Sequence, residues 1–442
     1  MPEAALDLKR ELGLRDLVLF NLAAVVSTRW IAAAAHAGSG ALTLWIVAGV
    51  FFLVPCAFVV AYLSRRFPEQ GGFYIWTREA FGEWHGYVCG LFYFINNVFW
   101  IPGVLIAAVG MIASSFTRFA ANAERPAFVL PVALLLLMLI VAANYVGLRV
   151  GKWVDSLGGI GVYVIWICLV AAALFLYLHR GSATRFQLSP NWDWQKLNFW
   201  AQMAFGMTGL ELSPILSGEI HNPRRTVFRA TWITTALVIL FYIAGTGAIL
   251  AIMPPENVSP VIGLTQAGVH AGNETGMLWL PTLIAVAIVL SLGGQLGTYV
   301  GACARLPFVI GIGNLLPPVF ARLHSKYRTP YLSILILGIG SAVLLLISQL
   351  GETFRAAYQT TIDFSVITLF IPFLYIFAAG FKFGKKLSGA LGLAVSLLAI
   401  IFSFVPTSDV SSVWRFEAKL VGGCILLFVI ARIFYLRYRT VK

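Results

Sequence analysis

The sequence has little charge, and its charged residues are mostly basic. Lys and Arg number 31 and Asp and Glu 18, so charged residues make up 11% of the 442, against about 25% in an ordinary soluble domain. Hydrophobic residues make up 60%, and the mean hydropathy is +0.87. A soluble chain of this composition would expose too much apolar surface to stay dispersed, and a disordered chain would need more charge. We therefore expect an integral membrane protein.

Cysteine and histidine are few and scattered, which argues against disulfides, metal sites and catalytic clusters. None of the five cysteines has a CxxC partner, and the six histidines form no HExxH or other ligand spacing. The sequence contains no paired Asp-rich motif of a membrane enzyme and no repeated filter loop of a channel. We expect no cofactor, no metal and no enzymatic activity. The net charge of +13 favours basic cytoplasmic loops over nucleic-acid binding.

Long apolar runs fill most of the chain. A bilayer core about 30 Å thick is crossed by roughly 20 apolar residues in a helix, and about twelve segments approach this length. No stretch between them is typical of a soluble domain, so we expect one all-α membrane domain over residues 1–442. The expected spans are 16–37, 41–64, 83–113, 127–147, 154–178, 197–219, 228–253, 276–306, 331–350, 355–380, 388–405 and 416–436.

The distribution of Lys and Arg among the loops predicts the orientation. If the spans alternate, most of these residues fall on the side of the N-terminus and few on the opposite side. Because basic loops remain in the cytoplasm, both termini are expected there, in a multi-pass protein of the plasma (inner) membrane. Residues 1–15 are charged and amphiphilic, without the apolar core of a signal peptide.

The first span is interrupted by polar residues. Ser27 and Thr28 can bond to backbone carbonyls and loosen the helix, and Arg29 follows them near mid-depth. An arginine at the bilayer centre costs roughly 2.5–3.5 kcal/mol on insertion scales, so Arg29 should face a partner or a watery cavity. Two alternatives remain open, in which Arg29 snorkels to the interface or pairs permanently with an acidic neighbour.

The sixth span is interrupted by glycines and a proline. Residues 205–214 are FGMTGLELSP, a composition that disfavours a continuous helix. Glu211 lies near mid-span, where a bare carboxylate is costly, so it is a candidate for binding a proton; alternatively it stays protonated or paired and holds helices together. Asp363, nearer one end of the tenth span, fits either a solvated interfacial role or a place on a pathway.

The two interrupted spans lie five spans apart. Because five is an odd number, a second five-helix unit would enter the membrane from the opposite side. This predicts an inverted repeat with a discontinuous helix leading each half. The units would be residues 16–178 and 197–380, with two extra helices in 388–436.

Three loop motifs now carry a resemblance to a known family. Residues 64–82 are SRRFPEQGGFYIWTREAFG, residues 218–226 are GEIHNPRRT, and residues 315–330 are LLPPVFARLHSKYRTP. They are similar to the patterns RFPxxGGxYxxxxxAFG, EEVKNPRRT and DGLLPxxFAxxHxxxxTP of the amino acid–polyamine–organocation (APC) superfamily of permeases. The motifs occur in the right order and after the right spans, and the resemblance extends over nearly the whole chain.

The resemblance implies a twelve-helix fold with a 5+5 inverted repeat that works by alternating access. The substrate would lie between the broken first and sixth helices, its carboxylate on N–H groups of the first and its amine on carbonyls of the sixth. Phe205 would be an aromatic lid, Tyr299 a second aromatic gate, and Glu211 a residue of proton coupling or gating. Asn97 and Gln295 are further polar lining candidates. The expected substrate-binding residues are Val26, Ser27, Thr28, Arg29, Trp30, Asn97, Ala204, Phe205, Thr208, Gly209 and Tyr299, and the expected coupling or gating residues are Glu211, Phe205, Tyr299, Gln295 and Asp363.

Two departures from the family pattern bear on substrate and coupling. Where most relatives carry a glycine run such as GSGIF, residues 27–31 are STRWI, and the VVSxR form is similar to the glutamate/GABA antiporter branch. A lysine that some members place in the fifth helix is absent, since its position falls near Gly161 or Val162. Arg29 disfavours cationic substrates, because like charges repel strongly at low dielectric, and favours an anionic side chain or a carboxylate.

The residues and the resemblance together predict a secondary active transporter of an amino acid or close derivative, with proton-linked uptake or exchange. The alternatives are a sodium-coupled or a polyamine/organocation permease and, from another class, a substrate-sensing receptor on a transporter fold. The expected partners are the amino acid, the bilayer, and a proton or counter-substrate; the sequence indicates no oligomeric state. One further hypothesis is that Arg29 and Glu211 pair in the empty protein and that substrate replaces one of them.

Overall fold

The computed structural model describes residues 10–123, 125–187, 189, 196–347, 354–405 and 413–439, and most of them are helical. Within these ranges the one sheet-like contact is an isolated bridge between Leu12 and Ile220. The helices of the first half are α1 (Leu14–Val25), α2 (Thr28–His36), α3 (Ala41–Ala48), the π-helical turn η2 (Gly49–Leu53), α4 (Val54–Arg66), α5 (Phe73–Phe81), α6 (Glu83–Ser114), α7 (Thr117–Ala120), α8 (Pro126–Val146) and α9 (Leu148–Arg180).

The second half has the same kind of elements. They are α10 (Lys196–Gly206), the 3₁₀ helix η3 (Ser213–Glu219), α11 (Pro223–Ile252), η4 (Pro255–Asn257), α12 (Gly263–Thr275), α13 (Leu280–Cys303), α14 (Arg305–Ile312), η5 (Pro318–Ala321), α15 (Tyr331–Ile347), α16 (Phe354–Lys382), α17 (Lys386–Phe402) and α18 (Val413–Arg439).

Nine segments of the described chain are long and apolar enough to cross a membrane. The shorter apolar helices α15 and α17, and the interrupted segment formed by α10 and η3, account for the remaining expected spans. The predicted all-α membrane fold is therefore confirmed. Helix ends differ from the expected bounds by a few residues: α9 begins at Leu148 rather than 154, so Asp155 lies two turns inside the helix, and α11 begins at Pro223 rather than 228.

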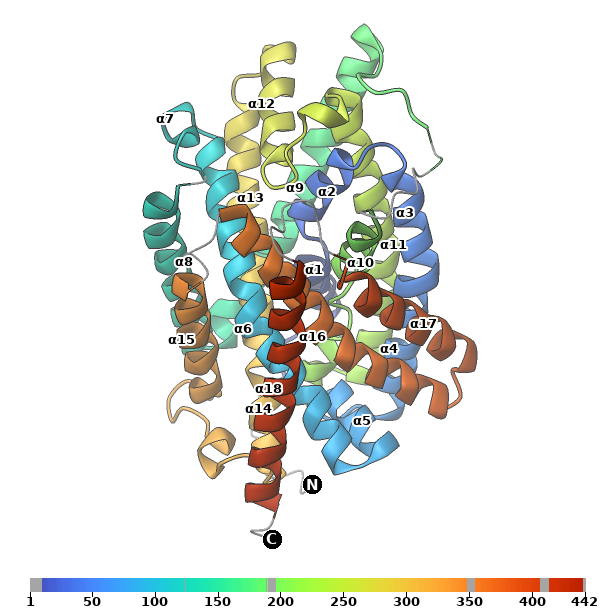
Figure 1. Cartoon of the computed structure of the whole chain (residues 1–442), viewed down its shortest axis with the longest axis vertical. Helices are drawn as coiled ribbons and strands as arrows, with labels where there is room; N and C mark the ends of the chain where they lie inside the picture. Colours follow the sequence, from blue (N-terminus) through green and yellow to red (C-terminus); the bar gives the residue numbers. More distant parts are fainter. Residues whose placement is uncertain are drawn as a thin grey trace.

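The helices run between two ends of the molecule (Figure 1). Helices α5 and α14 and the last turns of α18 lie at one end, and α7, α12 and the end of α9 at the other. We call the first of these the basic end, because α4 finishes there with Arg65 and Arg66, α16 with Lys382, and α11 begins there beside Arg224 and Arg225.

Helix packing follows the twofold pattern of an inverted repeat. The fifth span, α9, packs on the eighth, α13, just as the tenth, α16, packs on the third, α6. Spans that would correspond to each other also pair directly, as α4 with α11 and α8 with α15. Helices α17 and α18 pack around the outside, α17 against α16 and α4, and α18 against α6 and α16 (Figure 1).

Small residues set the distance between α9 and α13. A Cβ atom added to Gly158 would lie 2.6 Å from the Gly294 Cα atom, and one added to Gly161 would lie 2.7 Å from the Ala287 carbonyl oxygen. Close approach through glycine is typical of membrane helix pairs. At Gly161 a lysine side chain would therefore not fit in this packing.

Both predicted helix interruptions are present. Helix α1 ends at Val25, and Val26 and Ser27 are extended, with φ/ψ of −81/99° and −99/118°, before α2 begins. Helix α10 ends at Gly206, and Gly209 then adopts a φ of +127°, which L side chains rarely adopt. The chain continues as η3, whose second residue is Pro214. The polar, glycine and proline residues that predicted the breaks therefore lie at the breaks.

Candidate functional site

The two helix breaks lie against each other near the centre of the molecule. A Cβ atom on Gly209 would lie 3.2 Å from the Ala24 carbonyl carbon and 3.0 Å from Val25 Cγ2. A Cβ atom on Gly206 would lie 2.9 Å from Trp30 Cδ1. The glycines of the sixth span therefore allow its backbone to approach the break in the first span closely.

Tyr242 of α11 joins the two breaks. Its hydroxyl lies 2.8 Å from the Val25 carbonyl oxygen and 2.6 Å from that of Gly206, and it accepts a hydrogen bond of 3.1 Å from the Ser27 N–H. Its ring stacks on Trp45, with ring centres 4.1 Å apart. One side chain thus satisfies backbone groups that both unwound segments leave open. Sequence reasoning missed Tyr242; its only signal was a hydroxyl in the middle of an apolar span.

Gln295 of α13 supports the first break from the other side. Its Nε2 atom donates to the Ala24 carbonyl oxygen at 3.1 Å, so it satisfies a carbonyl at the end of α1. Gln295 is 2% exposed, and its Oε1 atom has no hydrogen-bond partner among the described residues. The structure therefore places this residue at the break, as expected for a lining residue of the eighth span.

Arg29 is buried without an acidic partner. Its side chain is 2% exposed, and no ion pair within the described ranges includes it. The guanidinium carbon lies 4.7 Å from the ring centre of Trp30 and 5.7 Å from that of Trp100, and Nε has no hydrogen-bond partner. Cation–π contacts stabilise the charge only in part. Neither snorkelling nor a permanent ion pair describes this arginine.

The carboxyl group of Glu211 forms hydrogen bonds with groups other than Arg29. It is fully buried, its Oε1 accepts a hydrogen bond of 2.6 Å from the Tyr93 hydroxyl, and its Oε2 accepts one of 2.9 Å from the Gly209 N–H. The hypothesis of an Arg29–Glu211 pair is therefore wrong for this structure. The carboxyl group instead connects the broken sixth span to α6, and its acceptance of the Gly209 N–H closes the turn at the break.

Several buried polar atoms around the first break lack a hydrogen-bond partner in the part of the chain that the structure describes. Ser27, as N-cap of α2, makes no side-chain cap, so it leaves N–H groups of the first turn uncapped. Buried polar groups nearly always have partners. The unpaired atoms at the break are Ser27 Oγ, Thr28 Oγ1 and Arg29 Nε, with Gln295 Oε1 beside it; Asn97 Oδ1 in α6 and Ser291 Oγ in α13 are further unpaired atoms of the described residues.

Aromatic rings form the walls beside this cluster. Phe205 meets Trp30 edge to face, with ring centres 5.9 Å apart, and Tyr299 meets Trp100 at 4.3 Å. Trp30 and Trp100 both contact Arg29, so each of the two expected gate residues packs on a ring that contacts the buried cation. Their roles as lid and gate stay predictions.

The carbonyls expected to bind an amine are partly occupied. The Phe205 oxygen accepts from the Thr208 hydroxyl at 2.7 Å and from its N–H at 3.1 Å, which uses both lone pairs. The Ala204 oxygen accepts one bond, from the Met207 N–H. The carbonyl oxygen of Ala204 can therefore accept a further hydrogen bond, whereas that of Phe205 cannot.

Asp363 and Asn96 are buried polar residues of spans other than the two interrupted ones. Asp363 in α16 is fully buried, so the solvated interfacial role considered for it is wrong, while a pathway role stays untested. Asn96 donates to the Ser365 carbonyl and to Thr368 Oγ1 and joins α6 to α16. Its neighbour Asn97 donates to Tyr93 within its own helix.

Asp155 is a buried carboxylate that sequence reasoning missed. It is 8% exposed and its Oδ1 accepts a hydrogen bond of 3.1 Å from Thr298 of α13. Nearby, Arg305 forms a bidentate pair with Glu219, with Nε–Oε1 and Nη2–Oε2 distances of 2.5 and 2.9 Å. The sequence signal that could have identified Asp155 is its spacing from Gly158. The two residues are one helical turn apart, so they lie on the same face of the helix, and this face packs on α13.

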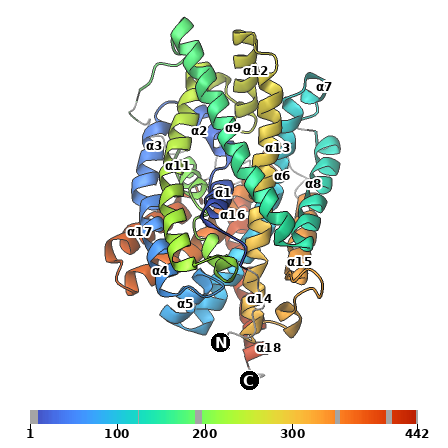
Figure 2. The ribbon, with the colours of Figure 1, turned by 180° about the vertical axis from the view of Figure 1, so that it is seen from behind.

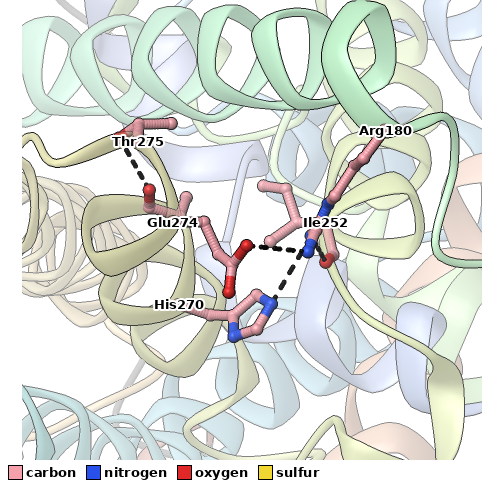
Figure 3. A network of polar contacts seen from close by, with 6 residues as sticks. Arg180, Ile252, His270, Glu274 and Thr275 are labelled. Atoms are coloured by element: carbon pink, nitrogen blue, oxygen red, sulfur yellow. Dashed lines mark hydrogen bonds and ion pairs between the residues drawn. The ribbon is translucent and has the colours of Figure 1, made fainter.

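A second polar network lies at the end opposite the basic end (Figure 3). Arg180, the last residue of α9, forms an ion pair of 3.1 Å with Glu274 and donates to the Ile252 carbonyl at 2.8 Å. Its Nη2 atom also lies 3.5 Å from His270 Nε2. One side chain thus connects α9, the end of α11 and the loop helix α12. The network is exposed, so its contribution to stability is small.

Two interrupted membrane helices whose open ends meet at buried polar atoms are the arrangement of a secondary transporter. Residues 12–430 match the family model described as amino acid permease, and the chain belongs to this family. The predicted membership of the APC superfamily of permeases is confirmed.

The relatives of the chain are transporters, which agrees with the expectation of a protein other than an enzyme. An uncharacterized transporter of Legionella pneumophila is 28% identical over 96% of this chain and 97% of its own length. The serine/threonine exchanger SteT of Bacillus subtilis is 25% identical over 86% of this chain and 85% of its own, and a cadaverine/lysine antiporter of Escherichia coli is 24% identical over 91% and 88%. The crystal structure of MhsT in complex with L-phenylalanine has a similar fold, with a TM-score of 0.65 and 13% identity over 90% of this chain and 99% of that one.

Proposed function

We propose that this protein transports an amino acid across the membrane by alternating access, with the helix breaks as its binding site and residues 1–442 as one transport domain. The observation that carries the proposal is Arg29, a buried cation without an acidic partner beside the uncapped N-terminus of α2. Both features favour an anion, and they act on the same point. A substrate carboxylate would supply the partner that the protein itself does not.

The amine of the substrate would lie toward the C-terminal end of α10. The partial negative charge of that helix end favours a cation, and the Ala204 carbonyl retains acceptor capacity. The rings of Trp30, Phe205 and Tyr299 would then cover the substrate. This arrangement suits a zwitterion whose two charges are held by the two helix ends.

Arg29 also selects by charge. A lysine or diamine would add a second cation close to the guanidinium at low dielectric, which costs free energy. A neutral or acidic amino acid pairs with it instead. The serine/threonine exchanger among the relatives agrees with this preference, whereas the cadaverine/lysine antiporter acts on substrates that we expect this chain to reject.

Coupling to protons, or exchange of one amino acid for another, is our proposal for the driving force. Glu211 lies at the break and binds Tyr93, so a change in its protonation would alter the link between the sixth span and α6. Sodium coupling is the second candidate, favoured by the free hydroxyl of Ser291 on α13. In keeping with the excess of basic residues at that end, the basic end would face the cytoplasm of the inner membrane.

The test is uptake of labelled amino acids into liposomes that contain the purified protein, under imposed proton, sodium or counter-substrate gradients. We expect saturable uptake of neutral or acidic amino acids and little uptake of lysine. Arg29→Ala should lower kcat/KM by about tenfold to a hundredfold, the value of one charge-assisted hydrogen bond. Arg29→Lys retains the positive charge but loses the planar pair of guanidinium donors. Its kcat/KM should lie between those of the unmodified protein and Arg29→Ala.

The exposed Arg118→Ala is the matched control and should behave as the unmodified protein. Glu211→Gln should abolish proton-driven uptake but spare exchange. Uptake that is indifferent to both Arg29→Ala and Glu211→Gln would contradict the proposed site. Substrate binding without any flux would favour a receptor instead.

A further inference from the structure

A groove at the basic end lies apart from the helix breaks. It is a cavity of about 650 Å³ between the last turns of α4, the first turns of α11 and the start of α17. These elements pack side by side, and in Figure 2 they lie together at the lower end of the molecule. Nothing in the proposed transport mechanism uses this groove.

Three cations surround the mouth of the groove. No ion pair within the described ranges includes Arg65, Arg66 or Lys385. Their neighbours are aromatic rings: the guanidinium carbon of Arg65 lies 5.1 Å from the ring centre of Phe228, and Lys385 Nζ lies 4.9 Å from that of Tyr62. Aromatic rings hold such cations in place and leave most of their N–H donors open. The groove therefore carries three positive charges that no carboxylate of the described chain compensates.

Arg66 is positioned in a similar way. Its guanidinium carbon lies 4.7 Å from the ring of Phe383, and its Nη1 atom donates to the Tyr62 hydroxyl at 3.2 Å. That hydroxyl in turn donates to the Phe383 carbonyl oxygen at 2.9 Å. The arginine is thus oriented by neutral groups rather than neutralised, and its remaining donors are available to an anion.

The other wall of the groove is apolar and faces the bilayer. Phe58 is 43% exposed and meets Trp232 edge to face, with ring centres 4.7 Å apart. Farther from the basic end, Phe51 of η2 and Leu240 of α11 are exposed as lipid-facing residues are. Toward the basic end, the exposed side chains therefore change from apolar to cationic. A phospholipid has the same order, from acyl chain to phosphate.

We propose that this groove binds an anionic phospholipid, with its phosphate on Arg65, Arg66 and Lys385 and an acyl chain against Phe58 and Trp232. Basic pockets between membrane helices bind such head groups. A free phosphate would satisfy the three cations but would leave the aromatic wall unused. The lipid would connect α4 and α11, which belong to the two repeats, to the outer helix α17.

The experiment uses the full-length protein in detergent, with bound lipid counted by native mass spectrometry. The probes are phosphatidylglycerol, phosphatidylcholine of the same acyl length, and inorganic phosphate. We expect phosphatidylglycerol to bind in preference, with a defined stoichiometry and a raised unfolding temperature. The triple variant Arg65→Gln, Arg66→Gln, Lys385→Gln should weaken its binding by about tenfold or more, since each cation contributes to anionic lipid binding.

The matched control removes three exposed cations elsewhere, Arg10→Gln, Arg322→Gln and Lys326→Gln, and should bind phosphatidylglycerol as the unmodified protein does. Phe58→Ala should weaken binding without any change of charge, and it serves as the second test if the triple variant does not fold. Equal binding of the two lipids, or loss of phosphatidylglycerol binding only in the control variant, would overturn the proposal. Displacement of the lipid by inorganic phosphate at equal concentration would assign the site to free phosphate and would also overturn it.

Discussion

Arg29 and Tyr242 show how single residues shape the centre of this protein. Burying an arginine costs free energy unless a partner compensates its charge. Among the described residues, Arg29 contacts two tryptophan rings and forms no ion pair with a carboxylate. Tyr242 has the opposite role, since its hydroxyl satisfies backbone groups of both broken helices. Arg29 is a buried cation whose charge a bound carboxylate would compensate. Tyr242 instead stabilises the unwound backbone, because its hydroxyl satisfies polar groups of both breaks.

Replacing Tyr242 tests this role at the scale of one atom. Tyr242→Phe should retain the stacking on Trp45 but leave the Ser27 N–H and the facing carbonyls without the hydroxyl, at a cost of about 1–3 kcal/mol. We expect a lower unfolding temperature and reduced amino acid uptake in liposomes. Tyr163→Phe, a half-buried tyrosine of α9 that contacts the ring of Phe241, is the control. Equal stability and uptake of both variants would show that the hydroxyl does not support the breaks.

At the scale of secondary structure, the interrupted first and sixth spans are the elements that matter. Helix α1 stops where Val26 and Ser27 become extended, and α10 stops before a glycine with positive φ. Each break is supported by neighbours, with Gln295 and Tyr242 at the first and Glu211 at the second. The breaks are therefore stabilised by hydrogen bonds from neighbouring helices, and they are not frayed helix ends.

Gly209 is the residue on which the second break depends. Gly209→Ala should destabilise the protein by about 1–3 kcal/mol, because alanine is strained at a φ of +127° and its Cβ would press on Ala24 and Val25. Uptake should fall even at temperatures where the variant remains folded, since the two breaks would separate. Gly247→Ala in α11, where an added Cβ meets nothing within 4 Å, should be neutral. The measurements are thermal unfolding and uptake; tolerance of Gly209→Ala would show that the positive φ is not required.

At the scale of the whole molecule, a buried ion pair joins separate parts of the chain at the basic end. Glu219 follows the broken sixth span in η3, and Arg305 begins α14 after the eighth span. The Glu11 N–H and the Leu12 N–H both donate to the Glu219 carbonyl, so the segment before α1 is attached at the same point. This contact thus connects η3 and the segment before α1 to α14, which follows α13.

Breaking this pair should destabilise the fold strongly. Glu219→Gln would remove the carboxylate that pairs with the buried Arg305, at a cost of about 3–5 kcal/mol. Glu79→Gln, which removes a charge from the exposed pair with Arg78, should change stability by less than about 1 kcal/mol. Thermal unfolding of the two purified variants checks the prediction. A similar small effect of both would mean that the Arg305–Glu219 contact is not a stabilising connection.

Much of the fold could be predicted from the sequence because its signals are local. Hydropathy marks each span, and the run from Ser27 to Arg29 and the glycines around Thr208 mark the breaks through backbone chemistry alone. The start of α9 was placed six residues late because Leu148 and its neighbours include charged residues, which a hydropathy window reads as a loop.

The partners of the polar residues could not be predicted in this way. Tyr242 and Val25 are separated by 217 positions and Tyr93 and Glu211 by 118, and only the packing of the helices brings them together. The sequence placed one cation and one carboxylate near the two breaks and suggested that they pair. In the structure Glu211 has partners of its own, so Arg29 remains without a counter-charge.

By itself, then, the sequence determined that the chain crosses the membrane about twelve times and where two of its helices come apart, because solvation and backbone conformation depend on neighbouring residues. The tertiary structure alone decided which buried groups satisfy one another, which of the described ones remain unpaired, and where cations gather into the groove at the basic end. Such pairings depend on distances between helices, and close packing sets those distances only when the bundle has formed.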